Sequence, residues 1–102
     1  MHAKRRGGDM DANARRAVTK MMWELEMTIR NYGSTSQGIR QVIDMGRSLR
    51  DAAREANGLE EGMREQIFNL LRNAKLLALA QANAEEYLQR LELIEDDLRR
   101  VS

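Results

Sequence analysis

Three arginines recur every seven residues in the middle of the chain, in an arrangement that could bind phosphate groups. On an ideal helix of 3.6 residues per turn, Arg40, Arg47 and Arg54 lie within about 40° of one another. Guanidinium groups in such a row can follow the phosphates of a nucleic acid without reading its bases. The spacing therefore predicts a helix face that contacts the backbone of a nucleic acid.

A second group of basic residues lies nearer the N-terminus, where positive charge is in local excess. Residues 1–20 contain six Lys and Arg against two Asp, whereas residues 85–102 contain three Arg against six acidic residues. This asymmetry favours a polyanion as the partner of one end. A basic tail and an acidic helix end, both solvated, would give the same count. The candidate phosphate contacts in this group are Arg15, Arg16 and Lys20.

The arginines in the middle of the chain also have an alternative interpretation as partners of nearby carboxylates. Arg40 and Asp44 are four residues apart, and so are Arg47 and Asp51. This is the spacing of ion pairs on a solvated helix face. Both interpretations stay open at the level of the sequence.

No constellation of residues in the sequence indicates catalysis. The chain has no Cys, a single His at position 2 and no glycine-rich phosphate loop. An acidic cluster near the C-terminus could attract a divalent ion, although it is also typical of a solvated helix end: Glu92, Glu95, Asp96 and Asp97. We therefore expect a protein that is not an enzyme and that holds neither a metal nor a cofactor.

Length and composition predict one small all-α domain. A chain of 102 residues can bury one core, but not the walled cleft that most enzymes need. Apolar residues make up 42% of the chain, and they are mostly Leu, Met and Ala. Pro is absent and aromatic residues are few, so strong helix formers dominate.

The sequence also predicts the compartment in which the protein works. The densest apolar run, residues 67–80, is interrupted by polar residues and cannot span a bilayer. The basic residues at positions 4–6 are followed by no apolar stretch, so a secretory signal is not expected. Together with the absence of Cys, these features favour a soluble, cytoplasmic protein with no membrane partner.

Helical periodicity predicts two helices of similar length in the first half of the chain. Apolar residues at spacings of three and four extend over residues 11–32 and again over residues 36–56. Gly33 and the pair Asn57-Gly58 indicate where these helices end.

The second half of the chain predicts either one long helix or two shorter ones. We expect residues 1–9 to form a mobile basic arm and residues 10–102 to form a single helical-bundle domain. Apolar residues hold one heptad phase for five repeats, which predicts a continuous third helix over residues 59–100. The alternative is a break near residue 82, with Asn83 capping a fourth helix. The expected fold is therefore an all-α bundle of three helices, the third long, or of four.

The lengths of the predicted helices indicate contacts with other subunits. A third helix of about 40 residues would be twice as long as its neighbours, so part of it needs another surface. Four apolar residues outside its heptad stripe are the expected contacts: Leu76, Leu79, Tyr87 and Ile94. We also expect Trp23, beside the stripe of the first helix, in a packed protein interface, the alternative being a core position under the third helix. The alternative is a third helix that folds back as a hairpin and buries itself.

Two short runs resemble the signatures of a known family. Residues 35–40 read Thr-Ser-Gln-Gly-Ile-Arg, which is similar to a Thr-Ser-Gln-Ile-Arg run interrupted by Gly38. Residues 77–83 read Leu-Ala-Leu-Ala-Gln-Ala-Asn, which is similar to a Leu-Ala-Tyr-Ala run followed by Arg, with Leu79 replacing the aromatic residue and Asn83 the arginine. In these runs the chain resembles the small-subunit family of type III CRISPR effector complexes.

Over residues 14–100 this resemblance implies a non-catalytic helical bundle, stacked in several copies along a ribonucleoprotein filament in antiviral defence. It implies three kinds of partner: the backbone of the guide–target RNA duplex, other subunits of the complex, and further copies of the chain. Arg40 carries over as an RNA-contact residue because it lies in the first run. Lys75 is added because it lies near the second run, whereas Arg47 and Arg54 rest on charge geometry alone.

The alternative function is that of a protein-only helical interaction module, such as a phage or mobile-element inhibitor or a structural oligomer. Nucleic-acid binding with a steep salt dependence would distinguish the two, because phosphate contacts release counterions and a protein interface need not. If the arginines formed only a solvated face, the protein-only alternative would lead.

Overall fold

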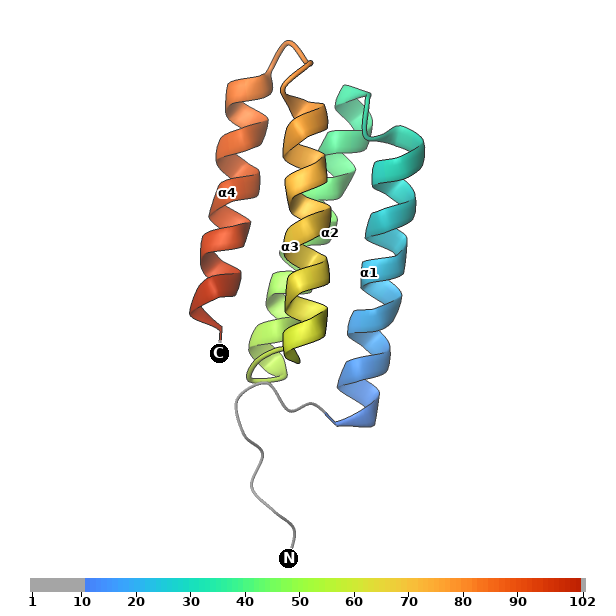
Figure 1. Cartoon of the computed structure of the whole chain (residues 1–102), viewed down its shortest axis with the longest axis vertical. Helices are drawn as coiled ribbons and strands as arrows, with labels where there is room; N and C mark the ends of the chain where they lie inside the picture. Colours follow the sequence, from blue (N-terminus) through green and yellow to red (C-terminus); the bar gives the residue numbers. More distant parts are fainter. Residues whose placement is uncertain (1–10, 102) are drawn as a thin grey trace, which may run out of the picture.

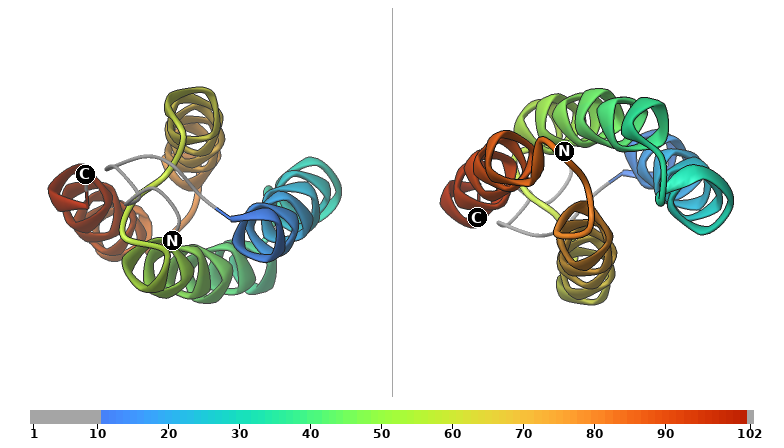
Figure 2. Two further views of the ribbon diagram at one scale, coloured as in Figure 1. Left: turned by 90° about the horizontal axis from the view of Figure 1, so that it is seen from below. Right: turned by 90° about the horizontal axis from the view of Figure 1, so that it is seen from above.

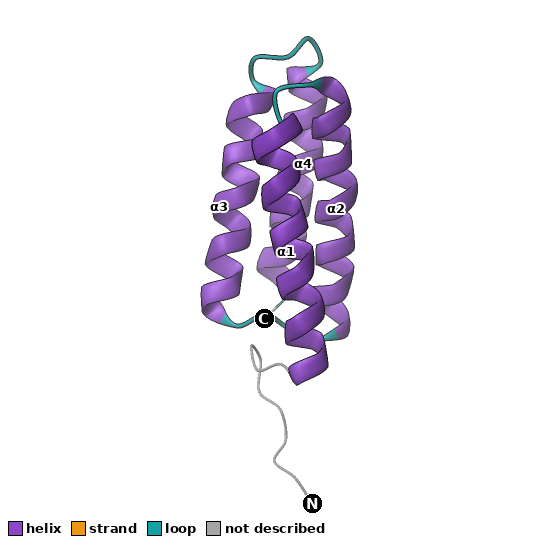
Figure 3. Ribbon diagram, turned by 90° about the vertical axis from the view of Figure 1, so that its right-hand side faces the viewer, coloured by secondary structure: helices purple, strands orange, loops and turns teal. Residues whose placement is uncertain are grey.

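The computed structural model describes residues 11–101 and is all-α over that range, as the composition predicts. Its helices are α1 (Ala12–Tyr32), α2 (Ser36–Glu55), α3 (Glu61–Ala78) and α4 (Ala84–Arg100) (Figure 1). The described residues contain no strand (Figure 3) and no helix both long and apolar enough to cross a membrane. The predicted mobile arm, residues 1–9, lies outside the described residues.

The four helices run alternately up and down a bundle. α1 and α3 point in one direction, and α2 and α4 point in the opposite one (Figure 1). Seen along the bundle, α1 lies beside α2 and α3, and α4 lies beside the same two helices (Figure 2). α1 and α4 therefore occupy opposite sides, and α1 and α3 together form one outer face.

α1 and α2 begin and end close to the residues that the sequence predicts. The Asp11 side chain accepts a hydrogen bond of 2.7 Å from the Ala14 backbone N–H and caps α1. Thr35 caps α2 by accepting a hydrogen bond of 2.9 Å from Gly38 N–H. Asn57, with φ 61°, follows α2 in the left-handed conformation, which is why an Asn-Gly pair is favourable there.

The second half of the chain forms two helices, so the continuous helix predicted over residues 59–100 is wrong and the alternative break near residue 82 is confirmed. α3 ends at Ala78, and a turn leads to the start of α4. Asn83 occupies the position before α4, but its side chain makes no capping hydrogen bond. The predicted cap is therefore absent, and local capping does not cause the break.

The break is held by a side chain that reaches across the end of the bundle. Gln81 Nε2 donates hydrogen bonds to the backbone oxygens of Gly33 and Thr35, each over 3.2 Å. These bonds fix the turn between α3 and α4 to the turn between α1 and α2. Because the chain reverses at this point, α4 packs along α2 instead of extending away from the bundle.

The core lies where the four helices meet, and aliphatic side chains dominate it. Gly46 of α2 faces Ile94 of α4: a Cβ atom at Gly46 would lie 3.0 Å from Ile94 Cδ1. The missing side chain thus lets α2 and α4 approach closely. The largest fully buried side chains are Tyr87, Leu25, Ile39, Leu49, Ile67, Leu71, Leu91, Ile94, Leu98, Val18 and Val42.

Candidate interaction surfaces

An open groove runs between α1 and α3 on their shared outer face. It consists of two hollows of about 440 and 350 Å³, and both are lined by Glu26 of α1 and Leu70 of α3. We call this pair of hollows the α1/α3 groove. The upper hollow, nearer the C-terminal ends of both helices, is further lined by Ile29, Arg30, Ser34, Asn73, Leu76 and Leu77. The lower hollow is further lined by Thr19, Met22, Trp23, Gln66 and Asn69.

Large apolar side chains are exposed along this groove. Trp23, in the wall of the lower hollow, is 62% exposed, and Leu76, in the wall of the upper hollow, is 61% exposed. Tyr32 at the end of α1 and Leu79 just after α3 are also exposed. Trp23, Leu76 and Leu79 thus lie at the surface, where the predicted protein interface requires them.

The other two predicted interface residues belong to the core of the protein itself. Tyr87 and Ile94 are each only 1% exposed, so the prediction that they contact another subunit is wrong. They lie outside the predicted heptad stripe because that stripe treats residues 59–100 as one continuous helix. In the separate helix α4, Tyr87, Leu91, Ile94 and Leu98 form the buried row.

The hydroxyl group of Tyr87 is buried near the upper end of α2 and α4. It makes no hydrogen bond of good geometry with any described residue. The side chains of Ser36, Asn83 and Arg40 nevertheless lower the pKa of Tyr87, Ser36 most strongly, and they outweigh the opposite effect of burial. The sequence carries no signal for this polar group inside the bundle.

Two of the three regularly spaced arginines on α2 are engaged with carboxylates. Arg47 Nη1 lies 3.6 Å from Asp44 Oδ1, and Arg54 Nη1 lies 3.8 Å from Asp51 Oδ1. Arg47 therefore pairs with the acid three residues before it, not with Asp51 as predicted, and Asp51 pairs with Arg54 instead. The solvated-face interpretation accounts for these two side chains.

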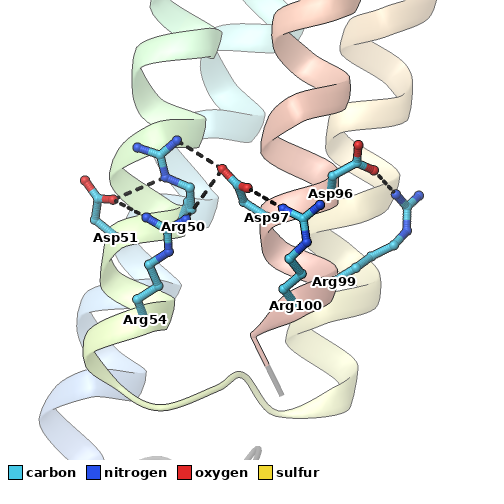
Figure 4. A network of polar contacts seen from close by, with 7 residues as sticks. All are labelled: Arg50, Asp51, Arg54, Asp96, Asp97, Arg99 and Arg100. Carbon is cyan, nitrogen blue, oxygen red and sulfur yellow. Dashed lines mark hydrogen bonds and ion pairs between the residues drawn. The ribbon is translucent and has the colours of Figure 1, made fainter.

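Arg54 also takes part in a network that joins α2 to α4 (Figure 4). Asp97 of α4 accepts contacts of 3.4 Å from Arg50, 3.5 Å from Arg54 and 3.3 Å from Arg100. The Asp97 side chain is 22% exposed, so these charges are partly shielded from water. The network has a structural role, and the sequence did not identify Arg50 or Asp97 as part of it.

Two further predicted phosphate contacts are held by intramolecular ion pairs. Lys75 Nζ lies 2.7 Å from Glu95 Oε1, in a contact that joins α3 to α4. Arg15 forms an ion pair with Glu60, and this hydrogen-bonded carboxylate raises the pKa of the guanidinium group. Each of these cations thus already has a carboxylate partner.

The remaining three predicted contacts form no ion pair with another described residue: Arg16, Lys20 and Arg40. Arg16 and Lys20 lie in the first half of α1, where they line a hollow of about 450 Å³. Arg40 lies near the start of α2, at the opposite end of the bundle, because α1 and α2 are antiparallel. The seven predicted phosphate contacts therefore do not form one continuous surface.

The acidic cluster near the C-terminus is likewise divided among separate partners. Asp96 pairs with Arg99 at 2.8 Å, Glu95 points to Lys75, and Asp97 belongs to the network on α2. Within residues 11–101, no group of three or more acidic or His side chains is arranged to hold a metal ion. Comparisons with protein-family models, curated proteins and solved structures gave no match.

Proposed function

We propose that this protein is a non-catalytic helical binding subunit that joins other protein chains through the α1/α3 groove. The observation that carries the proposal is the exposure of Trp23 and Leu76 in the walls of the two hollows. Large apolar side chains exposed beside a groove are typical of protein-binding sites. The protein-only alternative inferred from the sequence is therefore the better supported function.

Burial of these side chains supplies the free energy that binding needs. Removing a large apolar side chain from water contributes about 1.5–3 kcal/mol. Trp is also enriched among the few residues that dominate the affinity of protein interfaces. The neutral side chains of Gln66, Asn69 and Asn73 lie in the same groove. They can form hydrogen bonds with a partner without the cost of desolvating a charge.

A second candidate function is contact with an RNA backbone in a CRISPR ribonucleoprotein complex, as the family resemblance implies. It is favoured by three cations without an ion pair among the described residues, namely Arg16, Lys20 and Arg40. It is weakened by the four predicted contacts that already hold a carboxylate, because a phosphate would have to displace that carboxylate: Arg15, Arg47, Arg54 and Lys75.

Recovery of the tagged full-length chain from its native cells tests the proposal. We expect protein partners to co-purify with the wild type and to be lost from the double variant Trp23→Ser, Leu76→Ser. Leu93→Ser is the matched control, because Leu93 is 58% exposed but lies on α4, away from the groove. Equal recovery of partners by the double variant and the wild type would contradict the proposal. RNA recovered without any protein partner would favour the second candidate.

A further inference from the structure

The two hollows of the α1/α3 groove adjoin each other at Glu26 and Leu70, which line both of them. Trp23 lies three residues before Glu26 on α1, and Ile29 lies three residues after it. The lower half therefore carries a large exposed aromatic side chain, whereas the upper half offers an apolar hollow lined by Ile29 and Leu77.

A protruding side chain on one half and a hollow on the other make this surface complementary to itself. A two-fold axis perpendicular to the bundle exchanges the two halves, so the lower half of one copy meets the upper half of the other. An interface of this kind uses the same patch on both subunits, and every contact occurs twice. We infer that the occupant of the α1/α3 groove is a second copy of this chain, in an antiparallel dimer, an inference that rests on the proposed function.

The charges on α1 favour the antiparallel arrangement. Arg30 Nη2 lies 2.8 Å from Glu26 Oε2 within one chain, and both residues line the groove. When two copies of α1 meet antiparallel about a two-fold axis level with residue 28, Glu26 of each copy faces Arg30 of the other, which gives two attractive pairs. A parallel two-fold arrangement would instead place α1 of each copy against α3 of the other, so these pairs would not form.

The same register also places the aromatic side chain. In an antiparallel pair of helices, each step back along one copy corresponds to a step forward along the other. If Glu26 faces residue 30 of the second copy, Trp23 therefore faces residue 33. Residue 33 is next to Ser34, which lines the upper hollow. One register therefore satisfies both the charge pairing and the insertion of Trp23 into the apolar hollow of the second copy.

The size of the groove predicts a weak dimer. From Thr19 to Ser34 the groove follows α1 and the residues after it for about 24 Å, and two helices side by side are roughly 20 Å wide. The footprint is thus on the order of 500 Å² on each copy and 1,000 Å² in total, which is the lower limit for a specific interface. We expect reversible association in the micromolar range.

Analytical ultracentrifugation of the full-length chain tests the inference. We expect the mass to rise from one chain to two with concentration, and the emission of Trp23, the only Trp in the chain, to shift to shorter wavelength in parallel. Trp23→Ser should abolish dimerisation, and the α4 control Leu93→Ser should not. A wild-type chain that stays monomeric up to near-millimolar concentration overturns the inference.

A charge exchange tests the register. Glu26→Arg and Arg30→Glu, each alone, place like charges opposite one another in the dimer, so each variant should weaken self-association at least tenfold. A mixture of the two variants restores both attractive pairs and should form a mixed dimer. Unchanged self-association of either variant, or a mixture that stays monomeric, overturns the register. Circular dichroism of each variant reports whether the helices are intact.

The outcomes for the dimer and for the proposed function are separable. If the wild type is monomeric but loses its protein partners when Trp23 and Leu76 are changed, the inference fails and the proposed function stands. If the wild type dimerises in the antiparallel register but recovers no other protein, the chain is a structural homodimer. That result supports the inference and contradicts a role for the groove in joining different proteins.

Discussion

The ammonium group of Lys75 lies 2.7 Å from Glu95 Oε1, and this ion pair joins α3 to α4. The Glu95 side chain is only 6% exposed, so its charge is almost removed from water. A residue that the sequence placed among the RNA contacts is therefore a support of the fold. That Lys75 also contacts RNA stays a prediction.

Replacement of Lys75 by Met should destabilise the protein, because it leaves the Glu95 carboxylate buried without a partner. Breaking a largely buried ion pair from one side costs about 3 kcal/mol. Urea unfolding followed by circular dichroism measures this cost. The double variant Lys75→Met, Glu95→Leu should recover most of the stability, since it removes both charges. If Lys75→Met were as stable as the wild type, the ion pair between Lys75 and Glu95 would not stabilise the protein.

Gln81→Ala should loosen the end of the bundle where the two turns meet. The variant loses two hydrogen bonds, to the backbone oxygens of Gly33 and Thr35. We expect a loss of about 1–2 kcal/mol in the free energy of unfolding, together with faster hydrogen exchange in the turns. Gln89→Ala, at an exposed position on α4, is the control. Equal exchange rates in the two variants would contradict the role of Gln81.

The break after α3 also explains which parts of the fold the sequence could predict. In α1, Val18, Met22, Leu25 and Ile29 are buried as their spacing predicts, because a single helix fixes the phase of its apolar residues. The break itself depends on Gln81, whose acceptors lie more than 40 residues away in the chain. A local sequence pattern cannot indicate a contact between residues so far apart in the chain.

The incorrect prediction of one continuous third helix also affected which residues were expected at the surface. The buried row of α3 is Ile67, Leu71, Ala74 and Ala78, and the buried row of α4 includes Tyr87 and Ile94. Because the chain turns back after Ala78, the regular spacing of apolar residues in α3 does not continue into α4. Leu76 of α3 is therefore exposed as predicted, whereas Tyr87 and Ile94 of α4 are buried.

Tyr87→Phe should fold as well as the wild type at neutral pH, because the hydroxyl group it removes makes no hydrogen bond of good geometry. The two proteins should diverge at alkaline pH. The pKa of Tyr87 is lowered on folding from its ordinary value of 10.0, with Ser36 as the largest cause. The folded state therefore loses this proton more readily than the unfolded chain does.

The sign of this linkage fixes the direction of the divergence. Stability of the wild type relative to Tyr87→Phe should rise as the pH increases through the lowered pKa toward 10, and it should be lost as the pH falls back. Denaturant unfolding of both proteins between neutral and alkaline pH measures the difference. A constant difference across that range would show that Tyr87 has the same pKa in both states.

The phosphate contacts, if the chain binds RNA, should be the cations that the fold leaves without an ion pair. Neutralising Arg16, Lys20 and Arg40 with Gln should weaken binding to all RNA sequences alike, because phosphate contacts position a strand without reading its bases. For each cation that binds a phosphate, neutralisation should reduce the slope of log affinity against log salt by about 0.7–0.9.

The matched control replaces Arg47 and Arg54 with Gln, since both already pair with acids on α2. Titrations of RNA at several salt concentrations decide between the groups. A larger change of slope in the control would assign RNA binding to the α2 arginines, and an unchanged slope in both would contradict phosphate contact by either set.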